Sequence, residues 1–184
     1  MERKLLVLDL DLDHTFIYPS DTPLTSYDFT ITVRGATYWI KRRPHLDQFL
    51  NEADDNYDLM LWSASESEYV HKIVDKILPP HLSFVYIYTA DRCTTKWSQF
   101  SDYPHPYVIK DLKKVWRRKN HYTKKNTLVL DDTPKTYMRN YGNVIPIDGY
   151  YGGEDQELLR VLELLDKYES SQNVRVRKRD FSTQ

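Results

Sequence analysis

Five short apolar runs of the kind that forms buried β-strands are spread along the chain, each bounded by turn-forming or polar residues. They are Lys4–Leu10, Asp58–Trp62, Ser83–Tyr88, Asn126–Leu130 and Val144–Ile147. Segments in which apolar residues recur at helical spacing separate these runs. Strands that alternate with helices are typical of an α/β fold, and we expect a doubly wound parallel sheet.

Boundary signals place the helices between these strands. Pro44 suits the first turn of a helix, and Ser65 with Glu68 matches a capping box. The expected helices are one that follows Pro44 and carries Leu46, Phe49, Leu50 and Ala53, one that ends at Pro79-Pro80, a short basic one over Lys110–Lys119, and a last one near Glu154–Tyr168.

Two stretches do not follow this alternation. Phe29–Lys41 alternates around Arg34-Gly35, which is typical of a β-hairpin, and we expect it to form a flap beside the first strand. Residues from about 89 to 107 lack a clear period and are interpreted as a small insert. We expect the aromatic residues of Tyr86–Tyr107 to pack the insert's own core; contact with an extended peptide is the alternative. Neither stretch is long enough for a large cap domain.

Length and composition narrow the class of protein. With 184 residues the chain suits one domain, expected over residues 1–168, with a flexible tail over 169–184. A formal net charge of -1 gives no reason to expect direct binding of nucleic acid. The single cysteine, Cys93, excludes an internal disulfide framework and fits a reducing compartment.

Targeting signals give a second expectation. No window is apolar enough to span a bilayer, and the run Leu5–Leu8 is too short for the core of a signal peptide. We therefore expect a cytoplasmic or nuclear protein. The oligomeric state stays open.

The first strand ends in three aspartates at alternate positions, Asp9, Asp11 and Asp13. A buried parallel strand delivers such residues to the carboxyl edge of the sheet, where open α/β folds bind ligands. Carboxylates this close repel one another unless a cation neutralises them or one of them is protonated. Mg2+ is the natural partner, because it prefers a few carboxylates together with waters and phosphate oxygens. An acidic turn is the simpler alternative.

Three further features are predicted at the same edge. Ser63 follows the second strand, Lys110 precedes the fourth, and Asp131-Asp132 ends the fourth. Alone, Ser63 suggests a helix cap, Lys110 a solvated lysine, and the acid pair the start of a helix at Pro134. Together with the first acids they form the set that Mg2+-assisted phosphoryl transfer through an aspartyl intermediate requires.

These residues also resemble the motifs of a known family. Asp11-Leu12-Asp13-His14-Thr15 is similar to the DxDx[T/V] signature of haloacid dehalogenase (HAD) superfamily phosphatases, and three later segments are similar to its second to fourth motifs. Those segments are Leu61–Ser65, Lys110–Leu112 and Leu130–Pro134, and the flanks Lys41–Leu50, Asp91–Cys93 and Val144–Ile147 resemble the branch of RNA polymerase II C-terminal-domain phosphatases. The resemblance spans about residues 4–168 and implies a HAD-like Rossmannoid fold.

The repeat Asp9-Leu10-Asp11-Leu12-Asp13 allows two registers for the signature. Only the register that uses Asp11 and Asp13 places a threonine, Thr15, two positions after the second acid. We therefore expect Asp11 and Asp13 to be the catalytic pair. Asp9 is interpreted as an extra acid below the site, hydrogen-bonded within the strand or a turn.

The resemblance and the chemistry imply a role for each residue. Asp11 would be the nucleophile, and Asp13 the general acid and base, which requires a raised pKa. Asp11, Asp13, Asp131 and Asp132 would form the Mg2+ site. Substrate contacts would come from Thr15, Ser63, Ala64, Arg43 and Lys110.

Thin insertions imply an open cleft, which suits a phosphorylated side chain on a protein or peptide. Two basic clusters, Lys41–Arg43 and Lys113–Lys125, are candidates to attract it; solvated charged faces are the alternative. The resemblance favours phosphoserine or phosphothreonine, and phosphotyrosine also fits an open site. A non-catalytic binding scaffold, a phosphoaccepting receiver domain and a dehalogenase are the other readings of the same residues.

Overall fold

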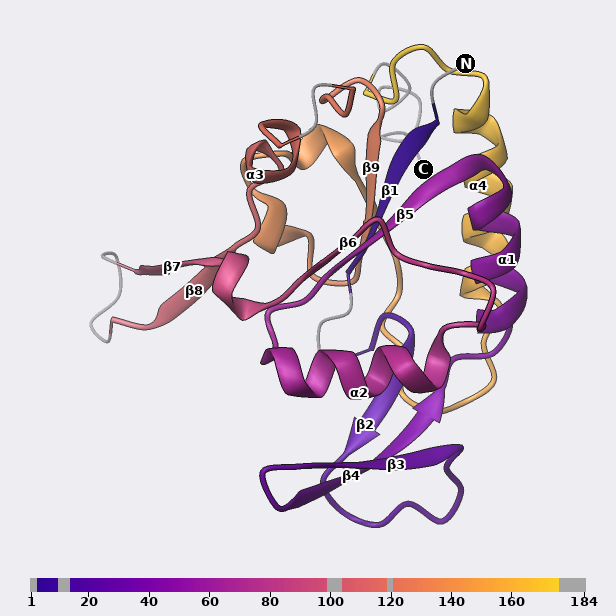
Figure 1. The fold of residues 1–184 in the computed structure, drawn as a ribbon, viewed down its shortest axis with the longest axis vertical. Coiled ribbons are helices and arrows are strands. Elements are labelled where there is room, and N and C mark those ends of the chain that lie inside the picture. Colours follow the sequence, from indigo (N-terminus) through magenta and orange to yellow (C-terminus); the bar gives the residue numbers. More distant parts are fainter. Residues whose placement is uncertain (1–2, 10–13, 99–103, 119–120, 176–184) are drawn as a thin grey trace.

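The computed structural model describes residues 3–9, 14–98, 104–118 and 121–175. Five parallel strands form its central sheet in the order β10-β9-β1-β5-β6 (Figure 1). The strands are β1 (Lys4–Asp9), β5 (Tyr57–Trp62), β6 (Tyr86–Tyr88), β9 (Thr127–Asp131) and β10 (Val144–Pro146). The predicted doubly wound α/β fold is therefore confirmed, and four of its five strands lie within one residue of their expected bounds.

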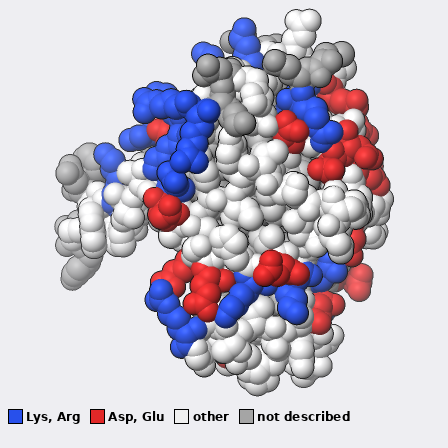
Figure 2. Space-filling model, in the orientation of Figure 1, with Lys and Arg blue, Asp and Glu red and all other residues white. Residues whose placement is uncertain are grey.

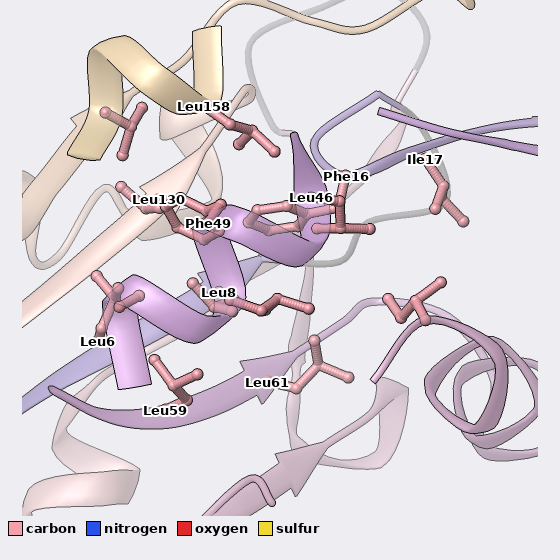
Figure 3. Packing of buried hydrophobic residues seen from close by; sticks show 14 of the residues in the cluster. Leu6, Leu8, Phe16, Ile17, Leu46, Phe49, Leu59, Leu61, Leu130 and Leu158 are labelled. Atoms are coloured by element: carbon pink, nitrogen blue, oxygen red, sulfur yellow. The ribbon is translucent and has the colours of Figure 1, made fainter. Parts of the chain in front are cut away.

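Side chains of β1 alternate between two buried layers, because successive residues of a strand point to opposite faces. Leu6 and Leu8 belong to a larger apolar cluster, whereas Leu5 and Val7 belong to a smaller one on the other face. Figure 3 shows Leu6 and Leu8 in the larger cluster beneath Phe49. Since all four are at most 1% exposed, β1 is the centre of the fold.

Four helices complete the two layers. They are α1 (Leu46–Asn56), α2 (Ser67–Ile77), α3 (Lys113–Trp116) and α4 (Glu157–Glu169). The first, second and fourth contribute to the larger cluster, and α1 and α4 lie side by side (Figure 1). On the other face α3 contributes Val115 to the smaller cluster. Short 3-10 helices are η1 (Ala90–Arg92), η2 (Pro134–Tyr137) and η3 (Tyr141–Asn143).

Two smaller antiparallel sheets project from this body. The expected hairpin forms β3 (Phe29–Val33) and β4 (Ala36–Arg42), and an additional strand, β2 (Ile17–Ser20), pairs with β4. Its turn has Arg34 and Gly35 at positive φ, as a tight hairpin turn requires. The insert is also a hairpin, formed by β7 (Thr94–Trp97) and β8 (Pro106–Ile109), which extends away from the body (Figure 1). We call this hairpin the arm.

Several local predictions were wrong. The basic helix expected over Lys110–Lys119 is shorter than predicted. It is α3, which begins at Lys113, because Lys110 follows β8 directly. The capping box does not form: Glu66 is the N-cap of α2 without a side-chain cap, and the Ser65 backbone N–H instead donates to the Ser63 hydroxyl oxygen at 3.0 Å. The first helix begins at Leu46, after Pro44 rather than at it.

The chain remains packed beyond the expected end of the domain. Val174 is 1% exposed, and its backbone N–H donates to the Lys125 carbonyl at 2.9 Å. Residues 170–175, expected in a flexible tail, thus continue the folded body, and residues 176–184 lie outside the described part. None of the described helices is long and apolar enough to cross a membrane.

We expect Phe49→Ala to lower the free energy of unfolding by about 3–5 kcal/mol, because it empties a fully buried position of α1 whose ring packs 5.6 Å from that of Phe16. Urea titration followed by circular dichroism measures this change. Val85→Ala, at a side chain that is 42% exposed, is the matched control and should shift stability by no more than about 0.5 kcal/mol. Equal losses in the two variants would contradict the assigned core.

Candidate active site

The carboxyl ends of the central strands meet at one edge because their registers are level. Identical segments, Leu6–Asp9 of β1 and Leu128–Asp131 of β9, lie side by side with Leu8 opposite Leu130. Asp9 is also level with Trp62 of β5, the residue before Ser63. The strand register therefore brings Asp9, Asp131 and Ser63 to the same level.

A buried ion pair occupies this edge. The Lys110 Nζ lies 2.6 and 2.7 Å from the two carboxylate oxygens of Asp9, and both side chains are fully buried. Lys110 reaches this place because it follows β8, where its backbone N–H donates to the Thr136 carbonyl at 2.8 Å. A buried charge requires an opposite charge and hydrogen bonds, and the two-oxygen contact supplies both.

The two acids after β9 have different surroundings. Asp131 is fully buried and accepts hydrogen bonds from the Thr133 backbone N–H at 2.8 Å and the Thr136 hydroxyl at 2.6 Å. Asp132 is only partly buried, and its carboxylate accepts a hydrogen bond from the Thr15 hydroxyl at 3.0 Å. Asp132 thus offers its carboxylate nearer to solvent, whereas Asp131 is held inside.

Ser63 is fully buried at the end of β5. Its backbone N–H donates to the Tyr88 carbonyl at 2.8 Å, and its hydroxyl oxygen accepts from the Ser65 backbone N–H at 3.0 Å. Ala64, which follows, is partly exposed. The turn after β5 therefore has the fixed backbone that an anion site needs, at the level of the acids.

Arg43 lies in a different place from the one expected. Its side chain is fully buried and forms an ion pair with Asp155, with Nη2 2.7 Å from Oδ2 and Nε 3.0 Å from Oδ1. Further donors of the guanidinium reach the carbonyl oxygens of Thr15 at 2.8 Å and Asp148 at 2.7 Å. This burial argues against direct contact with a substrate. Arg43 instead fixes the backbone that carries Thr15.

The same contacts control the protonation of Asp155. Burial by itself would raise the pKa of this carboxyl group, but hydrogen bonds from Arg43 and the backbone of Glu157, together with the Arg43 charge, outweigh it. The pKa of Asp155 is therefore held below its usual value of 3.8. The pair stays ionised under neutral conditions.

The structure brings Ser63, Lys110, Asp131 and, through Asp132, Thr15 to one edge. Asp11 and Asp13 lie outside the described residues. Motif spacing gives Asp9 only a place below the site, whereas in the described residues its carboxylate contacts Lys110. The signal that indicates Asp9 is the identical segment Leu-Val-Leu-Asp in β1 and β9, which aligns Asp9 with Asp131 when the two strands are placed side by side.

The edge carries carboxylates of the type that bind Mg2+ in proteins. Within residues 3–9, 14–98, 104–118 and 121–175, no group of three or more His, Cys, Asp or Glu side chains is placed to hold a metal ion. Asp131 and Asp132 do provide carboxylate oxygens, the ligand type that Mg2+ prefers, and Mg2+ commonly uses only one or two of them with waters and phosphate. The other acids named for this site, Asp11 and Asp13, lie outside these residues.

A group of basic side chains lies over α3, as Figure 2 shows. Lys113 and Lys114 belong to α3, and Arg117 and Arg118 follow it directly. Lys114 is used within the protein, since its Nζ contacts the Arg92 carbonyl at 2.6 Å, and the Arg118 guanidinium lies 5.9 Å from the centre of the Tyr88 ring. In the other basic cluster, Arg42 forms an ion pair with Asp47.

The described residues form an open α/β sheet with acids, a serine and a lysine at its carboxyl edge, which is where such sheets bind ligands. The profile of the NLI interacting factor-like phosphatase family matches residues 4–175. The chain belongs to this family.

Individual relatives agree with this assignment. A probable C-terminal domain small phosphatase of Dictyostelium discoideum is 28% identical over 94% of this chain and 53% of its own length. The human carboxy-terminal domain RNA polymerase II polypeptide A small phosphatase 2 is 24% identical over 90% of this chain and 58% of its own length. A Drosophila melanogaster CTD nuclear envelope phosphatase 1 homolog is 28% identical over 95% of this chain and 71% of its own length. The chain thus spans little more than half of the first two relatives.

Solved structures support the fold. Fission yeast RNA polymerase II CTD phosphatase Fcp1 bound to beryllium fluoride matches with a TM-score of 0.58 and 21% identity, over 97% of this chain and 55% of that one. A second Fcp1 structure matches with the same TM-score and 20% identity. At these identities the likeness concerns the fold alone.

We expect Lys110→Met to destabilise the fold by about 3–5 kcal/mol, because it leaves the buried carboxylate of Asp9 without its lysine. The double variant Asp9→Leu/Lys110→Met should recover most of this loss, since it removes both charges. Urea denaturation of the wild type, both single variants and the double variant measures the coupling. Additive losses would show that the two side chains do not form a pair.

Asp155→Asn should cost about 3 kcal/mol at pH 7, since it leaves the buried Arg43 guanidinium without its counter-charge. Because the folded-state pKa of Asp155 is lowered, its stabilising effect is present above about pH 4 and is lost as the pH falls through the lowered value. The stability gap between wild type and variant, measured by urea denaturation, should therefore shrink from pH 7 towards pH 3. A gap that stays constant over this interval would contradict the ionised pair.

Proposed function

We propose that this chain is a Mg2+-dependent protein phosphatase, which hydrolyses phosphomonoesters on phosphoprotein side chains through an aspartyl-phosphate intermediate. The observation that carries the proposal is the buried contact of Lys110 with an aspartate of the Leu-Asp repeat, on the same edge as Asp131, Asp132 and Ser63. The simpler alternatives, a solvated Lys110 and a Ser63 that only caps a helix, do not explain why Lys110 is buried against an aspartate at this edge. Family membership over residues 4–175 supports the same chemistry.

The chemistry needs an attacking carboxylate, a proton donor and positive charge around the phosphoryl group. A carboxylate oxygen of Asp11 would attack phosphorus as the bond from phosphorus to the ester oxygen breaks. Asp13 would give its proton to the leaving oxygen, and would then accept a proton from the water that hydrolyses the aspartyl phosphate. The ammonium of Lys110 and the Ser63 hydroxyl would hold the phosphoryl oxygens.

Mg2+ would be held by Asp11, the backbone carbonyl of Asp13 and Asp132, with Asp131 beside Lys110 or a bound water. When bound, the ion would screen the repulsion between the attacking carboxylate and the phosphate dianion. The partial exposure of Asp132 and its contact with Thr15 support this division between the two acids, because Asp131 already accepts two hydrogen bonds inside the protein.

The contact between Asp9 and Lys110 favours a second candidate nucleophile. A lysine that stabilises a transferring phosphoryl group lies beside the attacking carboxylate, and in this structure Asp9 has that position. In this alternative Asp9 attacks and Asp11 is the acid. The spacing to Thr15 still favours Asp11 with Asp13, in which case Asp9 positions Lys110.

A phosphorylated protein is the proposed substrate, with phosphoserine or phosphothreonine favoured over phosphotyrosine. A relative whose name refers to the carboxy-terminal domain of RNA polymerase II polypeptide A supports a protein substrate. A cytoplasmic or nuclear setting is proposed with it, since one relative is named as a nuclear envelope phosphatase. A broad-specificity phosphatase and a non-catalytic scaffold are the competing functions.

Turnover of 4-nitrophenyl phosphate tests the activity, and asparagine variants of the three aspartates test the register. We expect repeated turnover with Mg2+, loss of activity in EDTA and its return when Mg2+ is added back. Asp11→Asn should lower kcat by at least about 10³-fold if Asp11 is the nucleophile, and by about 10²-fold or more if it is the acid. Asp13→Asn should lower it by about 10²-fold or more only if the catalytic pair is Asp11 and Asp13.

Each remaining outcome has one meaning. An active Asp13→Asn variant together with an inactive Asp9→Asn variant would move the nucleophile to Asp9. Full activity of Asp11→Asn would refute both registers. A single phosphorylation without turnover would indicate a receiver, and the absence of any reaction in the folded wild type would indicate a scaffold. Mass spectrometry of acid-quenched enzyme locates the phosphorylated residue.

A further inference from the structure

A groove of about 650 Å³ lies between the arm and the segment after β9. One wall is the arm, with Lys96, Trp97 and Val108, and the other includes Lys135 and Met138. Among the described residues, the others that line it are Ser98, His105, Tyr107, Thr133 and Thr136. The groove is therefore defined on both sides.

Both walls of the groove lead directly into the candidate active site. β8 of the arm ends at Ile109, and the next residue is Lys110. On the opposite wall, Thr133 and Thr136 donate the two hydrogen bonds that hold the Asp131 carboxylate. The backbone hydrogen bond from Lys110 to the Thr136 carbonyl joins the two walls at 2.8 Å. A chain that leaves the catalytic edge on this side would enter the groove.

The groove presents apolar side chains to solvent. Trp97 is 63% exposed and Met138 is 46% exposed, although both are large apolar residues. The expectation that the aromatic residues of the insert pack its own core is thus wrong for Trp97. Figure 2 shows the arm as a mostly uncharged projection. Exposed aromatic and methionine side chains beside a site are typical of surfaces that bind another molecule.

The charge of the groove selects among the possible occupants. Lys96, Lys135 and His105 are its basic residues, and none of its ten described lining residues is acidic. Residues 176–184 of this chain carry Arg177, Lys178 and Arg179, so their charge does not complement the groove. A segment of a phosphorylated protein does complement it, because phosphate and flanking acids are negative.

We propose that this groove binds the segment of the substrate that flanks the phosphorylated residue. It would accept a large apolar side chain against Trp97 and Met138, with an acidic residue near Lys96 and Lys135. The inference rests on the proposed phosphatase function and adds to it the determinant of substrate sequence. The groove thereby selects the peptide, whereas the catalytic edge acts on any accessible phosphomonoester.

Two substrates measured in parallel test this proposal. One is 4-nitrophenyl phosphate, which has no peptide segment to occupy the groove. The other is a set of phosphoserine peptides in which leucine, and separately glutamate, is moved through each flanking position in a background of glycine and serine. We expect leucine at one flanking position to raise kcat/KM for the wild type about tenfold, mainly through a lower KM.

Variants of the groove should remove this preference. Trp97→Ala and Met138→Ala should lower the ratio of kcat/KM for the leucine peptide to that for 4-nitrophenyl phosphate by about tenfold. Lys96→Glu/Lys135→Glu should also lower the ratio for the glutamate peptides. Added salt should then raise this ratio instead of lowering it, because attraction has been replaced by repulsion. Tyr27→Ala and Lys76→Glu, at exposed residues outside the groove, are the matched controls.

The possible failures are distinguishable. If the ratio is unchanged in all three groove variants while their circular dichroism spectra remain native, the groove does not bind the substrate, although the phosphatase function stands. If neither substrate reacts with the folded wild type, the proposed function itself fails. Light scattering provides a third measurement. A dimer that Trp97→Ala converts to a monomer would show that a second copy of the chain occupies the groove, which overturns the proposal.

Discussion

The buried ion pair of Asp9 and Lys110 is the interaction on which the arrangement of the site depends. Its two members are 101 residues apart in the chain, so the pair forms only when β1 and β8 have both reached their final places. Two charges inside a protein are tolerated only when they compensate one another, and this requirement fixes the end of β1 against the segment that follows β8. Asp131 is then tied to the same segment through Thr136.

Arg43 has the equivalent role on the other side of the site. Its guanidinium connects Asp155 with the carbonyl oxygens of Thr15 and Asp148, so the chain that returns from the Leu-Asp repeat is held to the segment before α4. Thr15 in turn contacts Asp132. Two cations with fully buried side chains therefore organise an edge rich in acids. Lys110 holds the end of β1 through Asp9, and Arg43 holds the backbone of Thr15.

Most of the fold could be predicted from sequence because hydrophobic periodicity reports burial directly. β1, β5 and β9 are apolar on both faces, as expected for strands covered on both sides, and their bounds follow from that pattern. The arm could not be predicted, because strands that project into solvent lack an apolar period. The burial of Arg43 was also hidden, because no local pattern separates a buried arginine from a solvated one.

The position of Asp9 shows why motif spacing and strand register can disagree. A strand shifted by one residue turns every side chain to the other face, but a shift of two residues preserves the faces. Within the Leu-Asp repeat such a shift replaces leucine by leucine and aspartate by aspartate. It would also put Asp9 at the fully buried position of Val7 in the smaller apolar cluster, so burial favours the register of this structure. Spacing to Thr15 favours Asp11, whereas burial and the alignment of the two Leu-Val-Leu-Asp segments favour Asp9 beside Lys110. The two signals differ because motif spacing reports the loop after the strand, whereas burial reports the strand itself.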